Sequence, residues 1–372
     1  MKLALVRQAY TPFGGAERFV ERALSALRAR GTDVTVIARR WQGGGSADFL
    51  CCDPFYMGRT WRDAGFSRAV QKIVRSGRFD LVQSHERIPG CHIYRAGDGV
   101  HATWLALRGR ARGGMAEFAD AVSPWHRYTL RAEAAMFRDT RLKAVICNSK
   151  MVREDIARRF PEAAGKLHVI YNGVDLTRFR PSAEAGAGAA LRHELGISPQ
   201  TPVLLFVGSG FERKGVATLL DAMGKMQHRE ARLIVVGRDR NIGHYEARST
   251  QLGLGKRVFF LGGREDVRPC YAAANVFVLP TLYDPFPNAA LEALACGLPL
   301  VTSTTCGAAE LIETGVNGAL CAALDADALA DALDTMLDRP ADPAAIRDRV
   351  ADLGLDAMAG QLDGLYRQLA RV

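Results

Sequence analysis

The clearest indication of the fold is the stretch Thr281-Leu-Tyr-Asp-Pro-Phe-Pro-Asn-Ala-Ala-Leu-Glu-Ala-Leu-Ala-Cys-Gly-Leu-Pro-Leu-Val-Thr302. An apolar run, residues 276–279, precedes it and predicts a buried strand, and residues 289–296 have a helical pattern that ends at Gly297. A second apolar run from Pro299 onward begins another strand. Strand, loop, helix and strand in this order indicate an open α/β sheet.

Two carboxylates in this stretch are candidate ligand-binding groups. Asp284 lies in the predicted loop and Glu292 on the predicted helix. Open α/β sheets bind ligands outside the carboxyl ends of their strands, where such loops lie. The helix start near Asn288 also offers unpaired backbone N–H groups and a partial positive charge. An ordinary α/β turn with two solvated acids is the alternative explanation.

Length and composition indicate a globular protein of two domains. The chain has 372 residues, and no apolar run approaches the roughly 18 residues that span a bilayer. Arg7 interrupts the short apolar start, which predicts a first strand rather than a signal peptide. Eight cysteines without metal-ligand spacing are expected to be reduced thiols in the cytoplasm, and no zinc site is predicted.

The net charge of +9 is divided unevenly along the chain. Residues 1–180 carry 31 Lys and Arg against 17 Asp and Glu, whereas the remainder carries 18 against 23. The basic half is therefore expected to meet an anionic partner, such as nucleic acid, a phosphorylated sugar or a membrane surface. An arginine-rich composition without a specific partner is the alternative.

The first half opens as a doubly wound fold. A strand at residues 3–6, a loop containing Gly14 and Gly15, a helix at 16–30 and a strand at 34–38 follow one another. The two glycines would let a diphosphate or sugar approach the backbone, although a tight turn explains them as well. Asp98, between two glycines after another strand, is either a turn residue or a ligand contact.

Residues 101–137 interleave aromatic and basic side chains in a partly helical pattern. Arginine beside tryptophan suits an anionic membrane interface or the phosphates of a nucleic acid. An amphipathic helix with solvated arginines is the alternative. The candidate membrane or acceptor residues are Trp104, Arg108, Arg110, Arg112, Trp125 and Arg127.

An Ala- and Gly-rich passage suggests a hinge at about 172–190, after which the α/β rhythm restarts. Strands are expected at 203–207, 233–236 and 258–261. The first is followed by Gly208-Ser-Gly-Phe-Glu-Arg-Lys-Gly215, which ends in two cations but lacks the pattern of a Walker-type loop. Arg213 and Lys214 oppose the helix dipole unless an anion compensates, which favours a diphosphate site. The loops at Gly237 and at Gly262-Gly-Arg264 are expected at the same sheet edge.

Taken in order, these passages resemble the retaining glycosyltransferases of family four. The matching motifs are Phe13-Gly-Gly15, Asn172-Gly-Val-Asp175, Gly208-x4-Arg213-Lys214-Gly215, Gly262-Gly-Arg264 and the pair Asp284-x7-Glu292. The likeness covers nearly the whole chain and is greatest to lipopolysaccharide core glucosyltransferases that act on heptose. It implies the GT-B fold: two Rossmann-like doubly wound α/β domains facing across a cleft, an acceptor-binding domain at 1–171, a donor-binding domain at 172–354, and a final helix at 355–372 packing back on the first domain.

The resemblance also implies roles for individual residues. Arg213 and Lys214 would hold the donor diphosphate, Glu292 the ribose hydroxyls, and Asp284 the donor sugar. Asp98, or a nearby histidine, would be the acceptor-side catalytic residue, which makes Asp98 and Asp284 the candidate catalytic pair. The other candidate donor-binding residues are Gly14, Gly15, Gly208, Gly237, Arg264, Asn288 and Ala289. The family usually has Glu where this chain has Asp284, so glucose is less firmly implied than a nucleotide sugar.

The implied reaction transfers a sugar, glucose by resemblance, from a UDP-sugar to a lipopolysaccharide-core or similar lipid-linked glycan. Configuration would be retained, and no metal or other cofactor would be required, because the Arg-Lys pair takes the place of a metal's charge. The enzyme would be cytoplasmic and peripheral on the inner face of the cytoplasmic membrane. The alternatives are a nucleotide-sugar epimerase or other GT-B enzyme and a non-catalytic binder of anionic ligands; no recognised nucleic-acid motif is present.

Overall fold

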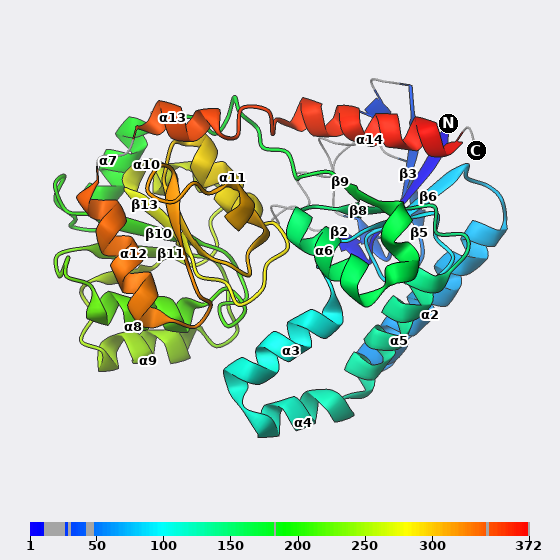
Figure 1. The fold of residues 1–372 in the computed structure, drawn as a ribbon, viewed down its shortest axis with the longest axis horizontal. Helices are drawn as coiled ribbons and strands as arrows, with labels where there is room; N and C mark the ends of the chain where they lie inside the picture. Colours follow the sequence, from blue (N-terminus) through cyan, green and yellow to red (C-terminus); the bar gives the residue numbers. More distant parts are fainter. Residues whose placement is uncertain (11–26, 29–30, 42–47, 182–183, 340–341, 371–372) are drawn as a thin grey trace. The chain divides into compact units, whose positions relative to one another are not determined.

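The structure is a computed structural model that describes residues 1–10, 27–28, 31–41, 48–181, 184–339 and 342–370. The predicted helix at 16–30 falls almost entirely outside these ranges, as do Gly14 and Gly15. The chain divides into two compact units (Figure 1). Unit 1 comprises Met1–Gly173 and Leu355–Val372, and unit 2 comprises Val174–Gly354.

Unit 1 is built on a parallel seven-stranded sheet with the order β5-β3-β1-β6-β7-β8-β9. Its strands are β1 (Lys2–Val6), β3 (Asp33–Ala38), β5 (Asp48–Cys51), β6 (Leu81–Ser84), β7 (Ile93–Arg95), β8 (Ala144–Cys147) and β9 (Leu167–Val169), with β2 (Ala9–Tyr10) and β4 (Arg40–Trp41) paired separately. Its helices are α2 (Gly58–Arg75), α3 (His101–Arg112), α4 (Gly114–Val122), α5 (Pro124–Arg138), α6 (Lys150–Arg159), the 3-10 helix η1 (Pro161–Lys166) and α14 (Leu355–Ala370).

Both faces of this sheet are covered, as the unbroken apolar strands require. Leu3 and Leu5 of β1 pack in a cluster with Leu362 and Tyr366 of α14. Ala4, between them, packs in a second cluster that contains residues of α2. Successive side chains of a strand point to opposite faces, so α14 and α2 cover the two sides of β1.

Unit 2 is built on a parallel six-stranded sheet with the order β12-β11-β10-β13-β14-β15. Its strands are β10 (Val203–Val207), β11 (Arg232–Val236), β12 (Val258–Phe260), β13 (Val276–Leu279), β14 (Leu300–Ser303) and β15 (Gly318–Cys321). Its helices are α7 (Ala185–Glu194), α8 (Val216–Lys225), α9 (Ile242–Gln251), α10 (Arg268–Ala273), α11 (Asn288–Ala295), the 3-10 helix η2 (Gly307–Leu311), α12 (Ala326–Asp338) and α13 (Pro343–Asp348).

In each unit the next two strands of the sheet are added on one side of its first strand, and the later strands are added on its other side, so that the strand order reverses. The reversal falls between β1 and β6 in unit 1 and between β10 and β13 in unit 2. This order defines the doubly wound fold, so the predicted fold class is confirmed for both units. The expected strands at 203–207 and 276–279 agree with β10 and β13 to the residue.

The predicted hinge at about 172–190 is wrong over its last third. Residues 185–194 form α7, because alanine is the strongest helix former and four alanines fall in residues 185–190. Gly188 lets this helix lie against α10, where a Cβ at that position would be 2.6 Å from the backbone of Ala272. The passage is therefore a packed element of unit 2.

Candidate active site

The candidate site of unit 2 lies at the reversal point of its sheet. β10 and β13 are hydrogen-bonded neighbours, and both are parallel, so their carboxyl ends meet at one edge. The loop at 208–215 follows β10, and the loop at 280–287 follows β13. This is where doubly wound sheets bind ligands. The positions of the two loops therefore follow from strand order alone.

A three-residue charge cluster joins these loops. Lys214 donates a hydrogen bond from Nζ to Oδ2 of Asp284 over 2.8 Å, and Arg213 donates to the same oxygen over 3.2 Å. Arg213 also donates to the carbonyl oxygen of Tyr283 over 3.1 Å. Lys214 and Asp284 are 8% and 5% exposed, whereas the side chain of Arg213 is 37% exposed. We call these three residues the charge cluster; its net charge is +1.

The carboxyl group of Asp284 is ionised at neutral pH despite its burial. Burial raises its pKa, but the positive charges of Lys214 and Arg213 and their hydrogen bonds outweigh this effect and hold the pKa below the usual value of 3.8. Buried charges persist only when they are paired in this way. The cluster is therefore a true ion triad.

Backbone contacts fix the position of Asp284. Its carbonyl oxygen accepts a hydrogen bond from Gly307 N over 2.8 Å, and its N–H donates to Thr305 O over 3.3 Å. The loop before it is bound to the first loop, because Leu282 N and the Thr281 hydroxyl both donate to Arg213 O. The main chain on both sides of the cluster is thus hydrogen-bonded.

Glycines in these loops allow close packing between the loops themselves. A Cβ at Gly208 would lie 2.4 Å from Cδ of Lys214, so the lysine chain runs directly over this residue. Gly215 has a φ of +76°, and a Cβ added there would lie 2.0 Å from the carbonyl oxygen of Pro280. A Cβ at Gly237 would lie 1.9 Å from the carbonyl oxygen of Gly208. The contacts explain Gly208 and Gly237 without a ligand.

Glu292, on α11, is hydrogen-bonded to a residue that the sequence did not single out. The hydroxyl of Tyr271 donates to Glu292 Oε2 over 2.9 Å and lies 3.1 Å from Ala289 O. Burial and the negative charge of Glu292 raise the pKa of Tyr271 well above its usual value, so it stays a donor. Asn288 and Ala289 are half-buried at the first turn of α11, where no side chain caps the helix. Nothing in the sequence spacing connects Tyr271 with Glu292.

The loops after β11 and β12 carry two further cations. Arg264 is half-buried and makes no hydrogen bond or ion pair within the described ranges. Arg238 is exposed, and its side chain lies over Gly263, where an added Cβ would be 2.6 Å from Nε. Both lie in loops that follow strands on the side of β10 away from β13, with β11 next to β10 and β12 beyond it. Of the two, Arg264 is a predicted donor-binding residue, whereas at the other loop the predicted residue is Gly237, next to Arg238.

In unit 1, Asp98 is exposed in the turn between β7 and α3. Arg87 donates to Gly99 O over 2.9 Å and to Glu133 Oε1 over 2.8 Å. His101 N donates to the same Glu133 oxygen over 2.9 Å. An ion pair between the buried Glu133 and the half-buried Arg87, which the sequence did not reveal, therefore holds the turn that presents Asp98.

The predicted membrane or acceptor residues divide into two groups. Arg108 forms two hydrogen bonds to Asp120, and Trp125 donates to Asp63 over 2.7 Å, so both contribute to contacts within unit 1. Trp104 is half-buried. The exposed members are Arg110, Arg112 and Arg127.

α4 carries two exposed apolar residues that the sequence pattern did not single out. Phe118 is 70% exposed and Val122 is 52% exposed, and they lie one helical turn apart. In Figure 1, α3 and α4 extend from the sheet of unit 1 and α5 returns beside α2. No described helix is both long and apolar enough to cross a membrane.

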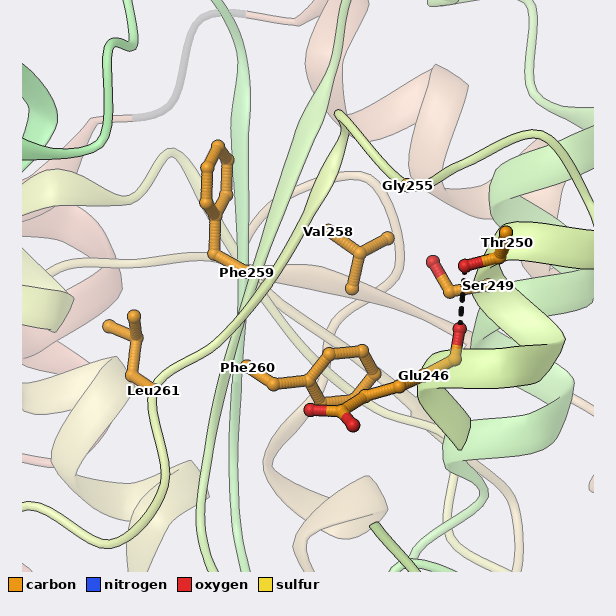
Figure 2. A pocket seen from close by; sticks show the side chains of 8 residues that line it. All are labelled: Glu246, Ser249, Thr250, Gly255, Val258, Phe259, Phe260 and Leu261. Carbon is orange, nitrogen blue, oxygen red and sulfur yellow. Dashed lines mark hydrogen bonds between the residues drawn. The ribbon is translucent and has the colours of Figure 1, made fainter. Parts of the chain in front are cut away.

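A separate cavity of about 360 Å³ lies between α9 and the edge strand β12 (Figure 2). Glu246 and Ser249 of α9 line one side, and Val258 and Phe260 line the other. None of the predicted site residues lines it. It is therefore distinct from the charge cluster.

Comparison with known proteins finds a match in each unit. Residues 13–178 match the family described as Glycosyltransferase Family 4, and residues 201–339 match Glycosyl transferases group 1. Lipopolysaccharide glucosyltransferase WaaG of Escherichia coli (strain K12) is 27% identical over 328 residues, covering 87% of this chain and 85% of that protein. Lipopolysaccharide core biosynthesis glycosyltransferase LpsE of Rhizobium meliloti (strain 1021) is 28% identical, covering 94% and 92%.

Solved structures show the same fold. The crystal structure of WaaG superposes with a TM-score of 0.82 at 24% identity, covering 98% of this chain and 99% of that one. Anabaena HepE in complex with UDP-glucose superposes with a TM-score of 0.72 at 22% identity, covering 99% and 100%. With a parallel doubly wound sheet in each unit, the architecture is GT-B. Because residues 13–178 match the family 4 glycosyltransferase domain and residues 201–339 match the group 1 glycosyltransferase domain, the chain that joins them is a glycosyltransferase.

Proposed function

We propose that this glycosyltransferase moves glucose from UDP-glucose to a lipopolysaccharide-core or similar lipid-linked glycan, with retention of configuration and without a metal ion. One observation carries the proposal: two cations, Arg213 and Lys214, converge at the reversal point of the donor-unit sheet. The names of the similar proteins given above are the reason for proposing a nucleotide sugar as the donor and this class of glycan as the acceptor.

The charge cluster suits a diphosphate. Arg can donate two parallel hydrogen bonds to phosphate oxygens, and Lys acts as a compact point charge. Negative charge grows on the diphosphate as the sugar–oxygen bond breaks, and fixed cations stabilise that charge most where water is excluded. Lys214, 8% exposed, is in such a place.

The remaining donor contacts follow from the neighbouring loops. Glu292 would accept hydrogen bonds from the ribose hydroxyls, with Tyr271 fixing its orientation. Arg264 would lie beside the uracil, and Asp284 would accept from hydroxyls of the sugar. Backbone N–H groups of Asn288 and Ala289, at the start of α11, would add donors to the sugar phosphate. UDP is proposed because HepE was solved with UDP-glucose, and glucose because WaaG is a glucosyltransferase.

Retention and metal independence are linked in this proposal. The departing diphosphate would take the proton of the attacking acceptor hydroxyl on the same face of the sugar. The positive charge of Arg213 and Lys214 would then do what a divalent ion does in other transferases. Asp98 would act on the acceptor side, held by Arg87 and Glu133.

A lipid-linked acceptor requires the enzyme to reach a membrane. Unit 1 carries the excess of basic residues. α3 ends with Arg110 and Arg112, and α4, which contacts α3, carries the exposed Phe118 and Val122. Apolar side chains next to arginines suit an anionic membrane surface. We place the enzyme on the inner face of the cytoplasmic membrane.

A transfer assay with a panel of UDP-, GDP- and ADP-sugars and a lipopolysaccharide-core acceptor tests the proposal. We expect transfer from UDP-glucose, an α-linked product by NMR, and the same rate in EDTA. Failure of every donor in the panel to bind below millimolar concentration would reject the proposed function. Loss of turnover in EDTA that a divalent ion restores would reject metal independence alone.

A further inference from the structure

Asp284 occupies the hydrogen-bonding positions that a donor diphosphate needs. Its Oδ2 accepts from both Lys214 and Arg213, at 2.8 and 3.2 Å. The two cations are therefore already engaged by a carboxylate of the protein. A diphosphate that approaches them meets a negative charge of the protein.

The carboxylate cannot move far from this position. The backbone of Asp284 is hydrogen-bonded to Gly307 and Thr305. The side chain has a single methylene group, one fewer than the glutamate usual in this family. Its reach is thus confined to the vicinity of Lys214.

A free nucleoside diphosphate and a nucleotide sugar differ in what they offer this carboxylate. The diphosphate brings only oxygen acceptors and negative charge, so it repels Asp284 when both contact Lys214. A nucleotide sugar carries one fewer negative charge and brings hydroxyl groups that can donate to Asp284. Only the intact donor replaces the hydrogen bonds that the carboxylate loses.

We propose that Asp284 selects the intact nucleotide sugar over the nucleoside diphosphate product, by serving as the counter-ion of Lys214 and Arg213 when the site is empty and as an acceptor of sugar hydroxyls when the donor is bound. This inference rests on the proposed function. After transfer the hydroxyls leave with the product glycan, and repulsion by Asp284 promotes release of the diphosphate.

The test compares the affinities of the full chain for UDP and UDP-glucose by calorimetry. In Asp284→Asn the cluster rises from +1 to +2, and we expect UDP to bind about tenfold or more tightly than to the wild type. UDP-glucose loses an ionic hydrogen bond and is expected to gain no affinity. The ratio of the two dissociation constants therefore changes by about tenfold or more, and UDP becomes a stronger product inhibitor.

Two variants serve as controls. Asp284→Glu keeps the charge and should bind UDP as the wild type does. Glu246→Gln removes one exposed negative charge from α9, beside the separate cavity, and should leave both affinities unchanged. Where Asp284→Asn does not fold, as judged by its thermal transition, Asp284→Ser removes the same charge and carries the same expectation.

An affinity ratio within about threefold of the wild type in the charge-removing variant would overturn the inference. The proposed function would stand in that case, because both ligands bind. If the wild type binds neither UDP nor any nucleotide sugar, the proposed function itself is overturned, and the inference with it.

Discussion

The side chain of Lys214 can take its position only because residue 208 is a glycine. The lysine stem crosses Gly208 so closely that a Cβ there would lie 2.4 Å from Cδ and 2.8 Å from Cε. The stem ends at Asp284, 70 residues away in sequence. The missing side chain at residue 208 thus lets the ammonium group of Lys214 reach Asp284 at the reversal point of the sheet.

Gly208→Ala should displace Lys214 and weaken UDP binding by about 1.5–3 kcal/mol, the range for a lost hydrogen bond to a charged group. Calorimetric titration with UDP measures this. Gly243→Ala is the matched control, because an added Cβ there meets nothing within 4 Å and alanine suits α9. Equal UDP affinities in the two variants would show that Lys214 does not depend on Gly208.

Among the elements, α3, α4 and α5 of unit 1 share a polar junction of buried and half-buried side chains. His101 Nε2 of α3 lies 3.0 Å from His126 Nδ1 of α5, and Asp120 of α4 is 3.5 Å from His126 Nε2. Arg108 of α3 donates to Asp120 over 2.7 Å. One network thus joins the three helices.

This junction predicts acid sensitivity. Burial, then the positive charges of Arg87 and His126, lower the pKa of His101 to about 3. An unfolded histidine titrates near 6.5, so full stability is present above about pH 6.5 and is lost as the pH falls toward 3. The loss from this residue approaches about 1.4 kcal/mol per pH unit.

Unfolding free energies between pH 7 and pH 5 should therefore fall less steeply in His101→Gln than in the wild type. His193→Gln, at an exposed position of α7, is the control. A wild-type slope in His101→Gln would contradict the assignment of the proton uptake to His101.

The exposed face of α4 carries the membrane prediction. The double change Phe118→Asp and Val122→Asp should reduce binding to vesicles containing phosphatidylglycerol, because it places two acids on the exposed apolar surface of α4. The double change Val316→Asp and Leu252→Asp, at 45% and 39% exposed positions of unit 2, controls for charge and hydropathy. Sedimentation with vesicles measures the difference, and equal losses in both proteins would remove α4 from the interface.

Helices and strands could be predicted from the sequence better than the contacts between side chains of different elements. The strand, loop, helix and strand around Asp284 were found nearly to the residue, because Gly and Pro bound short apolar runs. The ion triad of Asp284, Lys214 and Arg213 could not be predicted from the sequence, because it depends on β13 lying beside β10 in the sheet. Likewise the pairing of Arg108 with Asp120 depends on how α4 folds back on α3, which the sequence does not show.

At the scale of the whole molecule, the chain returns to unit 1 through α14. Met358, Leu362 and Tyr366 enter the core beneath β1 and β6, and the hydroxyl of Tyr366 donates to Gln83 Oε1 over 2.6 Å. Unit 1 is thus completed by residues that follow all of unit 2. Its stability depends on the final helix.

Leu362→Ala should destabilise unit 1 by about 2–5 kcal/mol, because the residue is 3% exposed and its loss leaves a cavity. Hydrogen exchange of β1 and β6 amides should accelerate, while β10 and β13 amides keep their rates. Leu252→Ala, at a 39% exposed position after α9, is the control. Acceleration confined to unit 2 would contradict the role of α14.

The central claim is that Arg213 and Lys214 bind the diphosphate of a nucleotide-sugar donor. Its most direct test is calorimetric titration of UDP-glucose into the wild type and into Lys214→Ala, with Lys225→Ala, an exposed lysine of α8, as the matched control. We expect saturable binding below millimolar concentration, unchanged in Lys225→Ala and weakened by about 1.5–3 kcal/mol in Lys214→Ala. Equal affinity in the wild type and Lys214→Ala would contradict it.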